Sequence, residues 1–389
     1  MRTSITVIAL ILVAGLALSA PATAQDSTLR SARHDYRVVT VVEGLVHPWS
    51  MTWLPNGDML VTERPGRLRI VRDGQLLPEP VAGLPTIRAG GQGGLLDVVP
   101  HPNFSANRLL YISYAKPSAD DSLGTTAVIR GRWENDRLAN VEEIFEAKAW
   151  TRGRGHHGSR LAFDRDGYLF ITVGDRQAPA TGNLEAHPAQ DLTNHYGTTL
   201  RLHDDGRVPA DNPFVGRTDA LPEIWSYGHR NQQGLAVHPE TNDVWATEHG
   251  PQGGDELNLI QAGKNYGWPV VGFGVNYRSG TTIHSDMTRE GMENPVHFWV
   301  PSIATAGLLV YTGDAFPGWR GNLFVGGMAG QQLARLTLDH QRVMNEETLA
   351  QGIGRIRDVR QGPDGFIYLA IDDRGGAPSA LVRLEPVAR

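Results

Sequence analysis

Short apolar runs that follow turn residues recur along the whole chain, whereas apolar residues at the spacing of an amphipathic helix are scarce. The turn Pro55-Asn56-Gly57-Asp58, for example, precedes the run Met-Leu-Val-Thr at 59–62. A turn followed by a short run of this kind predicts a β-strand. Six copies are present, with predicted strands at 59–62, 109–112, 168–171, 244–247, 323–325 and 366–369.

Most copies are followed by a second predicted strand in which arginine alternates with aliphatic residues, as in a strand with one solvated face. Six repeats over residues 25–389 average about 61 residues each, longer than compact propeller repeats, so several blades carry loop insertions. The intervals are longest between Gly167 and Gly321, where we expect these insertions. The arginine-containing strands lie at 68–70, 128–130, 200–202, 333–336 and 381–384.

The repeat predicts an all-β fold, a six-bladed β-propeller formed by one domain over residues 25–389. A pair of β-sandwiches fits less well, because two domains would be joined by a linker and no charged or low-complexity linker is present. A propeller gathers its loops around one mouth of a central channel, where functional residues collect.

The N-terminus has the pattern of a secretory signal peptide. Arg2 precedes an apolar run at 5–20, and Ala22-Thr23-Ala24 supplies small residues for cleavage. The run is shorter than the ~20 apolar residues of a membrane-spanning helix, and no second candidate follows it. We therefore expect residues 1–24 to be a cleaved signal peptide, a periplasmic or secreted protein, and no membrane span.

The charge and the composition of the chain exclude several classes of partner and site. The chain has 36 basic and 42 acidic residues, a net charge of −6, so attraction to nucleic acid is not expected. It has no Cys, which excludes disulfides, thiolate metal sites and a cysteine nucleophile. The 45 Gly and 24 Pro residues suit a fold with many turns.

A histidine and an aspartate flank one predicted strand unit. His156 precedes the unit, and Asp175 ends it at Val173-Gly174-Asp175. If both loops open at one mouth, Asp175 is placed to orient a ring nitrogen of His156, as a carboxylate does for a general base. The alternative is that His156 and His157 only bind loop backbone.

Two further clusters suggest ligands. Asp255 and Glu256 beside glycines supply the oxygen-rich surroundings that calcium prefers, although a polar turn has the same composition. Arg355 and Arg357 are two apart, hence on one face of a strand, where they are placed to clamp a ligand with several carboxylates. A solvated strand face is the alternative.

Taken together, these segments resemble the soluble quinoprotein sugar dehydrogenases, the glucose/sorbosone dehydrogenase family. This family includes periplasmic aldose sugar dehydrogenases that use pyrroloquinoline quinone. The resemblance runs from about Val42 to the C-terminus, and the family's fold is a six-bladed propeller. Its motifs here are Gly91-Gln92-Gly93-Gly94-Leu95-Leu96, 156–161, Val173-Gly174-Asp175, 227–234, Glu248-His249-Gly250-Pro251, Asp255-Glu256, Asn265-Tyr266-Gly267-Trp268-Pro269 and 355–359.

The resemblance implies a base, a residue that orients it and a cation. His156 matches the family's base, which takes the proton of the anomeric hydroxyl while hydride leaves the sugar carbon for the quinone. Asp175 would orient His156. Arg230 would polarise the quinone oxygen, a task that suits a fixed cation beside developing negative charge.

The resemblance also implies residues that contact the quinone. Gln92 and Asn231 match two such positions, and Tyr277 is a looser match for a third. Arg355 and Arg357 match the arginines near the carboxylates of the cofactor.

Two calcium sites are implied by the same resemblance. Gly250 and Pro251 correspond to the backbone carbonyls that hold the cofactor's calcium. Glu256 and the carbonyl of Tyr266 match a separate structural calcium site. The sequence departs from the family at one place: members often carry a lysine in the loop after a strand of the fifth blade, where this chain has Ala329, so that one charged contact to the cofactor is missing.

The sequence thus predicts a quinone- and calcium-dependent enzyme that oxidises the anomeric hydroxyl of aldose sugars to the lactone and passes electrons to a diffusible acceptor. A calcium-dependent lactonase or esterase and a non-catalytic binding propeller are the alternatives. The arginines at 355 and 357, with Arg230 and Asn231, favour the dehydrogenase, because a neutral lactone does not need so many cations.

Overall fold

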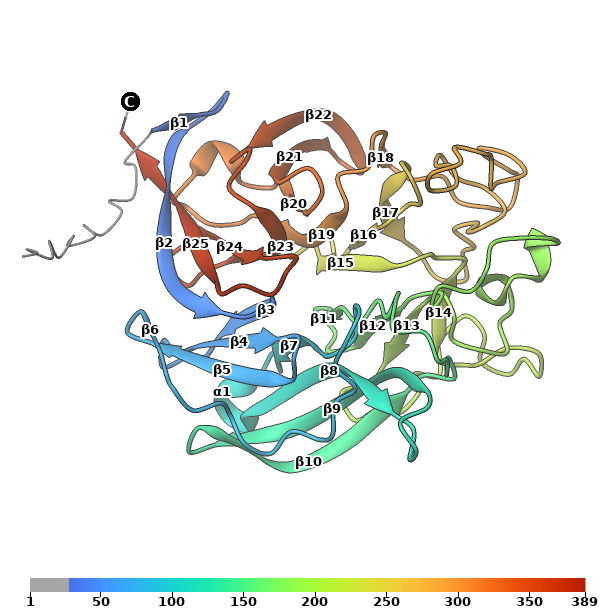
Figure 1. The fold of residues 1–389 in the computed structure, drawn as a ribbon, viewed down its shortest axis with the longest axis horizontal. Coiled ribbons are helices and arrows are strands. Elements are labelled where there is room, and N and C mark those ends of the chain that lie inside the picture. Colours follow the sequence, from blue (N-terminus) through green and yellow to red (C-terminus); the bar gives the residue numbers. More distant parts are fainter. Residues whose placement is uncertain (1–27, 389) are drawn as a thin grey trace, which may run out of the picture.

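Each of the six predicted apolar runs forms the second strand of an antiparallel sheet in the computed structural model, which describes residues 28–388. The predicted signal peptide at 1–24 lies outside the described residues. The arginine-containing runs form the third strands of five of these sheets. The sheets surround a common centre as the blades of a propeller (Figure 1), which confirms the predicted fold class.

Blades one to three follow one another along the chain, and in each the strand order in the sheet is the order in the sequence. Their strands are β3 (Pro48–Trp53), β4 (Met59–Glu63), β5 (Arg67–Arg72) and β6 (Gln75–Leu76); β7 (Leu95–Pro100), β8 (Leu109–Pro117), β9 (Gly124–Glu134) and β10 (Arg137–Glu146); β11 (Leu161–Phe163), β12 (Leu169–Val173), β13 (Thr198–Leu202) and β14 (Ile224–Tyr227).

Blades four and five are built in the same way, whereas blade six combines both ends of the chain. Their strands are β15 (Gln232–Val237), β16 (Val244–Glu248), β17 (Asp255–Ile260) and β18 (His297–Trp299); β19 (Thr305–Val310), β20 (Leu323–Gly327), β21 (Gln332–Asp339) and β22 (Arg342–Leu349); β23 (Arg355–Gln361), β24 (Ile367–Asp372), β25 (Ser379–Val387), β2 (Asp35–Leu45) and β1 (Leu29–Arg30).

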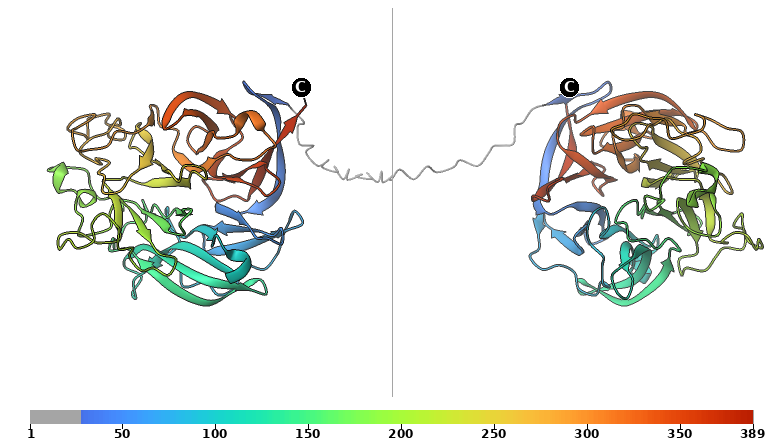
Figure 2. Two further views of the ribbon diagram at one scale, coloured as in Figure 1. Left: turned by 180° about the vertical axis from the view of Figure 1, so that it is seen from behind. Right: turned by 45° about the vertical axis from the view of Figure 1, so that its right-hand side comes forward.

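The ring is closed by pairing of the N-terminal strand β2 with the C-terminal strand β25, in a register that places Val38 opposite Leu384. Figures 1 and 2 show these two strands side by side at the edge of the molecule. Closure leaves the outer strand of each blade at the rim and the first strand at the centre. Labels β3, β7, β11, β15, β19 and β23 accordingly surround the centre of Figure 1.

Helical structure is short throughout residues 28–388, and none of it is long and apolar enough to cross a membrane. The helical segments are α1 (Phe104–Asn107) and the 3-10 turns η1 (Leu184–Ala186), η2 (Pro188–Gln190) and η3 (Pro317–Trp319). The longest connections are those of blades three and four, at 174–197, 203–223 and 261–296. They lie together on the right-hand side of Figure 1.

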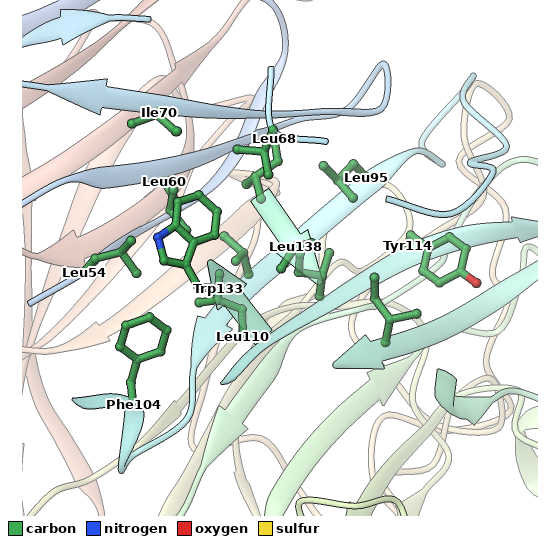
Figure 3. Packing of buried hydrophobic residues seen from close by; sticks show 14 of the residues in the cluster. Leu54, Leu60, Leu68, Ile70, Leu95, Phe104, Leu110, Tyr114, Trp133 and Leu138 are labelled. Atoms are coloured by element: carbon green, nitrogen blue, oxygen red, sulfur yellow. The ribbon is translucent and has the colours of Figure 1, made fainter. Parts of the chain in front are cut away.

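Apolar side chains fill the space between neighbouring blades. Strand β5 shows why, because Leu68 and Ile70 are buried while the alternating Arg69 is half-buried. Figure 3 shows the indole of Trp133, from blade two, among Leu54 and Leu60 of blade one. Such contacts hold each blade against the next and fix the angle at which its first strand reaches the centre.

Charged side chains fill the centre itself. Arg160, which immediately precedes β11, lies 2.8 Å from Asp358 of β23 and 3.8 Å from Asp97 of β7. Arg360 lies 2.8 Å from Asp97 and 2.9 Å from Asp358. Two arginines and two aspartates therefore balance at the axis, and the indole of Trp49 lies 4.1 Å from the guanidinium of Arg160.

We predict that Arg160→Met lowers the free energy of unfolding by roughly 3–5 kcal/mol, because among the described residues the two buried carboxylates would keep only Arg360 as a positively charged partner. Urea unfolding followed by tryptophan fluorescence measures the change. Arg320→Met, at a side chain that is 54% exposed, is the matched control and should stay within about 0.5 kcal/mol of the wild type. Equal stability of both variants would contradict the importance of this network.

Candidate active site

The proposed base and its partner lie at adjacent strand ends in blade three. His156 lies five residues before β11, and Asp175 lies two residues after β12, the antiparallel neighbour of β11. The loop and the strand end therefore meet at the same side of the blade. His156 Nδ1 is 2.6 Å from Asp175 Oδ1, and both side chains are buried.

The carboxylate of Asp175 is surrounded by donors. Its Oδ2 accepts a hydrogen bond from Trp268 Nε1 at 2.7 Å, and its Oδ1 accepts one from Gln177 N at 2.9 Å. Burial alone would raise the pKa of Asp175, but His156, the charge of Arg230 and the backbone N–H of Gln177 lower it below its usual value. Asp175 is therefore ionised and fixed in place.

Because an ionised carboxylate only accepts, Nδ1 of His156 carries the ring proton, and Nε2 is left with its lone pair. Nε2 has no hydrogen-bond partner among residues 28–388. Burial lowers the pKa of His156 below its usual value; Asp175 opposes this effect, and Arg230 adds to it. The ring is thus neutral at pH 7 and ready to take a proton.

Two amide side chains hold the loop that carries His156. Gln92 Oε1 accepts from the backbone N–H of His156 at 2.7 Å, and Asn231 Oδ1 accepts from that of Gly158 at 3.1 Å. The loop needs such support, because His156 has φ of +45°, a left-handed conformation unusual for a residue with a side chain. Gln92 and Asn231 thus lie beside His156.

Arg230 is fixed by blade four. Its backbone N–H donates to Glu248 Oε2 at 2.7 Å, and its Nη1 donates to the carbonyl of His249 at 3.0 Å. The guanidinium carbon lies 5.2 Å from the ring of Trp268, the residue that also binds Asp175. Arg230 Nε is buried and has no hydrogen-bond partner among the described residues. The N–H at Nε of Arg230 is therefore available to donate to a ligand.

The two arginines of β23 do not follow simple alternation, which corrects the expectation from their spacing. A β-bulge between Ile356 and Asp358 makes Arg357 an extra residue in the pairing with β24. Arg357 Nη1 donates to Gln233 Oε1 at 3.0 Å, whereas Arg355 Nη1 donates to the carbonyl of Met328 at 3.3 Å. Both guanidinium groups nevertheless belong to one electrostatic cluster around Asp372.

This arginine cluster carries more positive than negative charge, because Arg355 and Arg357 share the single carboxylate of Asp372. Burial and, to a smaller extent, the nearby arginines lower the pKa of Arg357 to about 9, although the charge of Asp372 opposes them. Arg355 Nε is buried without a hydrogen-bond partner among residues 28–388, and its ion pair with Asp372 is a loose one at 3.7 Å. A ligand with several carboxylates fits this combination of buried cations and spare donors.

The predicted calcium ligands line one small cavity of about 20 Å³, next to Arg230 and Trp268. Glu248 is buried and Glu256 is half-buried here, and the Asn258 amide donates to each of them. Burial raises the pKa of Glu256 well above its usual value, and the charge of Glu248 adds to the rise. A divalent cation would stabilise two such carboxylates. The predicted ligands at the cavity wall are Gly250, Pro251, Glu256 and Tyr266.

The donor set matches a hard cation rather than a zinc-like ion. Within residues 28–388, no three His, Cys, Asp or Glu side chains converge as a metal centre does. Further oxygen ligands beside the two carboxylates would therefore come from backbone carbonyls, an arrangement that calcium accepts.

One predicted contact residue lies apart from the others. Tyr277 is 61% exposed in the long connection of blade four. Its neighbour Arg278 donates through its backbone to Gln252, but the ring of Tyr277 makes no hydrogen bond or ring contact with another candidate among the described residues. The structure therefore does not bring it together with His156.

Three residues of the site received no separate assignment from the sequence. Trp268 binds Asp175, Glu248 holds the backbone of Arg230, and Gln233 joins Asn231 to Arg357. Trp268 and Gln233 lie inside the quoted motifs, and Glu248 begins another, so the motifs marked the right segments. Their contacts span up to 124 residues, and no local spacing reveals such a contact.

The six-bladed propeller brings together a buried histidine–aspartate pair, an adjacent cation and a cluster of arginines, which defines a ligand-binding site. The sequence profile of the Glucose / Sorbosone dehydrogenase family matches residues 45–383. The chain belongs to this family, which confirms the resemblance drawn from its motifs. Membership also confirms the prediction that the protein is an enzyme of the sugar dehydrogenase class.

Individual relatives agree with this family. The aldose sugar dehydrogenase YliI of Escherichia coli is 40% identical over 93% of this chain and 96% of its own length. The apo form of the soluble aldose sugar dehydrogenase of Escherichia coli covers 90% of this chain and 100% of its own, with 38% identity and a TM-score of 0.83. The PQQ-bound aldose sugar dehydrogenase of Streptomyces coelicolor is 27% identical, with a TM-score of 0.72 over 90% of this chain and 98% of its own.

We predict that Trp268→Phe lowers kcat by about tenfold, a part of the 10²–10⁴ that a positioned base contributes. Without the indole N–H, Asp175 attracts the proton of His156 more strongly, so the pKa of His156 rises and the acidic limb of the pH–rate profile moves to higher pH. Dye reduction measured across pH reports both effects. Trp225→Phe is the control, because its Nε1 has no hydrogen-bond partner among residues 28–388. If kcat falls but the pH–rate profile does not shift, Trp268 acts through packing and not through its hydrogen bond to Asp175.

Proposed function

We propose that the protein is a periplasmic or secreted quinoprotein that oxidises the anomeric C1 hydroxyl of aldose sugars to the lactone. Its cofactors are pyrroloquinoline quinone and calcium, and a diffusible acceptor takes the electrons. The observation that carries this proposal is that Asp175 holds His156 with its Nε2 free to accept a proton. Trp268 donates to Asp175 and also packs against the guanidinium of Arg230, so the cation lies beside this pair. The quinone-bound relative and the cluster of uncompensated arginines support the choice of cofactor.

The reaction removes one proton and one hydride from the sugar. When bound, pyrroloquinoline quinone supplies a two-electron acceptor for the hydride that leaves C1. The C1 hydroxyl proton passes to Nε2 of His156, and the oxygen forms a double bond to C1 as the O–H and C–H bonds break. Asp175 stabilises the imidazolium that results, because its carboxylate faces Nδ1 at 2.6 Å.

Cations of the chain would bind and polarise the cofactor. Arg230 is positioned to stabilise negative charge that develops on an oxygen, since its Nε has no hydrogen-bond partner within residues 28–388 and its side chain is buried. Arg355 and Arg357 would hold carboxylates. Gln92 and Asn231 lie at the same mouth, where they already hold the backbone beside the base.

Two separate sets of predicted calcium ligands lie at the wall of the 20 Å³ cavity. The carbonyls of Gly250 and Pro251 would hold the ion that accompanies the cofactor. Glu256 and the carbonyl of Tyr266, with Glu248 nearby, would hold a second ion that stabilises the fold.

The proposed export of the protein rests on the signal-peptide pattern at residues 1–24.

The direct test loads purified protein with pyrroloquinoline quinone and calcium and measures dye reduction with a panel of aldoses. We expect lactone to form with at least one aldose. His156→Ala should abolish turnover while quinone binding, followed by absorption, stays near that of the wild type. Absence of both dye reduction and a change in quinone absorption would overturn the proposed function.

The pH dependence of the rate follows from the state of His156. Only the neutral ring accepts a proton, and burial holds the pKa of His156 below its usual 6.5. We therefore expect kcat/KM to stay level from pH 8 down to about 6.5 and to fall at lower pH as the ring is protonated. A loss of activity that begins clearly above pH 7 would show that another group limits the rate.

Calcium removal should destabilise the folded protein. Without a cation, Glu248 and Glu256 repel each other in a buried cavity, so we expect chelation to lower the Tm by several degrees, on the order of 1–2 kcal/mol. Differential scanning fluorimetry with and without EGTA measures this shift. In Glu256→Gln, which removes one of the two charges, the chelator should have little further effect; a wild-type Tm that EGTA leaves unchanged would count against this site.

A further inference from the structure

Arg64 is a half-buried cation that immediately follows β4. Its backbone is fixed: the N–H donates to the carbonyl of His47 at 3.0 Å, and the carbonyl accepts from Leu95 N at 3.2 Å. Its guanidinium makes no hydrogen bond or ion pair with any residue in the range 28–388. The backbone is thus held in place while the charged end is available to a ligand.

The surroundings of Arg64 belong to the arginine cluster. The backbone carbonyl of His47 accepts from Arg64 N, and its ring Nδ1 lies 2.8 Å from Asp372 Oδ1 of blade six. Asp372 is paired in register with Arg355 and lies 3.7 Å from its Nε. Burial lowers the pKa of Arg64, and the charge of Arg355 lowers it further, while Asp372 opposes both effects.

The charges in this cluster do not balance. Arg64, Arg355 and Arg357 surround Asp372, and that carboxylate also binds His47. The neighbouring arginines at the axis, in contrast, already have one aspartate each. Two positive charges are therefore left without a partner in a partly buried place, which is unfavourable unless an anionic ligand binds there.

A glycine lets Arg64 occupy this position. At Gly94, φ is +154°, and a Cβ would lie 1.8 Å from the carbonyl oxygen of Arg64 and 2.8 Å from its Cγ. Any larger residue would push the end of β4 away from the channel. Gly94 thus serves the placement of Arg64 as well as the connection between blades one and two.

We propose that Arg64 is a third arginine of the carboxylate-binding site, holding a carboxylate of the quinone together with Arg355 and Arg357. This inference rests on the proposed function. Arg64 follows the second strand of blade one, as Ala329 closely follows the second strand of blade five, and the two loops flank Arg355 of blade six. Arg64 therefore supplies a positive charge that Ala329 does not.

The test is the affinity of the apo protein for pyrroloquinoline quinone, measured by quenching of tryptophan fluorescence in the presence of calcium. We expect Arg64→Met to raise the Kd by about tenfold or more, because a charge-assisted contact is lost, and Arg64→Lys to raise it less. Arg342→Met, at a side chain that is 73% exposed on β22, is the control and should bind like the wild type. An unchanged Tm of apo Arg64→Met verifies that the fold is intact.

A second variant tests the charge itself. Ala329→Lys in the Arg64→Met background restores a cation on the other side of Arg355 and should recover much of the lost affinity. In addition, the Kd of the wild type should rise more steeply with salt than that of Arg64→Met. If Arg64→Met binds the quinone as tightly as the wild type at every salt concentration, the proposed role of Arg64 is wrong, but the proposed function still stands. Failure of the wild type to bind the quinone overturns the proposed function instead.

Discussion

The four-charge network at the propeller axis is the constraint on which the site depends. Arg160 and Arg360 each contact both Asp97 and Asp358, so three first strands are fixed relative to one another. Blade four joins through the carbonyl of Gln233, which accepts from Arg160 at 2.6 Å. Blade five approaches with Gly307, where a Cβ would lie 2.6 Å from Asp358. Because the first strands are locked here, the residues just before them, His156 among them, reach the mouth in fixed positions.

The two groups of buried arginines differ in whether aspartates balance their charge, and this difference distinguishes a structural role from a ligand-binding role. At the axis, two arginines meet two aspartates, and the charges cancel without any ligand. At the mouth, Arg355 and Arg357 share Asp372, and Arg230 has a buried nitrogen without a partner among the described residues. A chain with net charge −6 has thus concentrated positive charge at one place. Such a local excess attracts anions of low molecular weight, whereas the overall charge does not attract nucleic acid.

The repeated second strands made the fold predictable, because each blade buries the same short apolar run. The third strand of blade four, β17, could not be predicted from the sequence because it lacks the arginine pattern. It begins instead with Asp255 and Glu256, which lie at the predicted calcium site. Pairing of β2 with β25 joins residues that are more than 300 positions apart, and alternation alone does not encode it. At the site, His156 and Asp175 follow from the ends of one hairpin. Trp268 depends on packing between blades, which explains why its bond to Asp175 could not be predicted.

A continuous line of hydrogen bonds connects the base to the arginine cluster. Gln233 Nε2 donates to the carbonyl of Gly158 at 3.1 Å and to Asn231 Oδ1 at 3.2 Å, while its Oε1 accepts from Arg357. Since an arginine only donates, Arg357 fixes which end of the Gln233 amide faces the loop of His156. The base and the cluster are therefore one hydrogen-bonded unit built on the axial network. The geometry that would hold the cofactor's carboxylates is also the geometry that holds the base in its unusual backbone conformation.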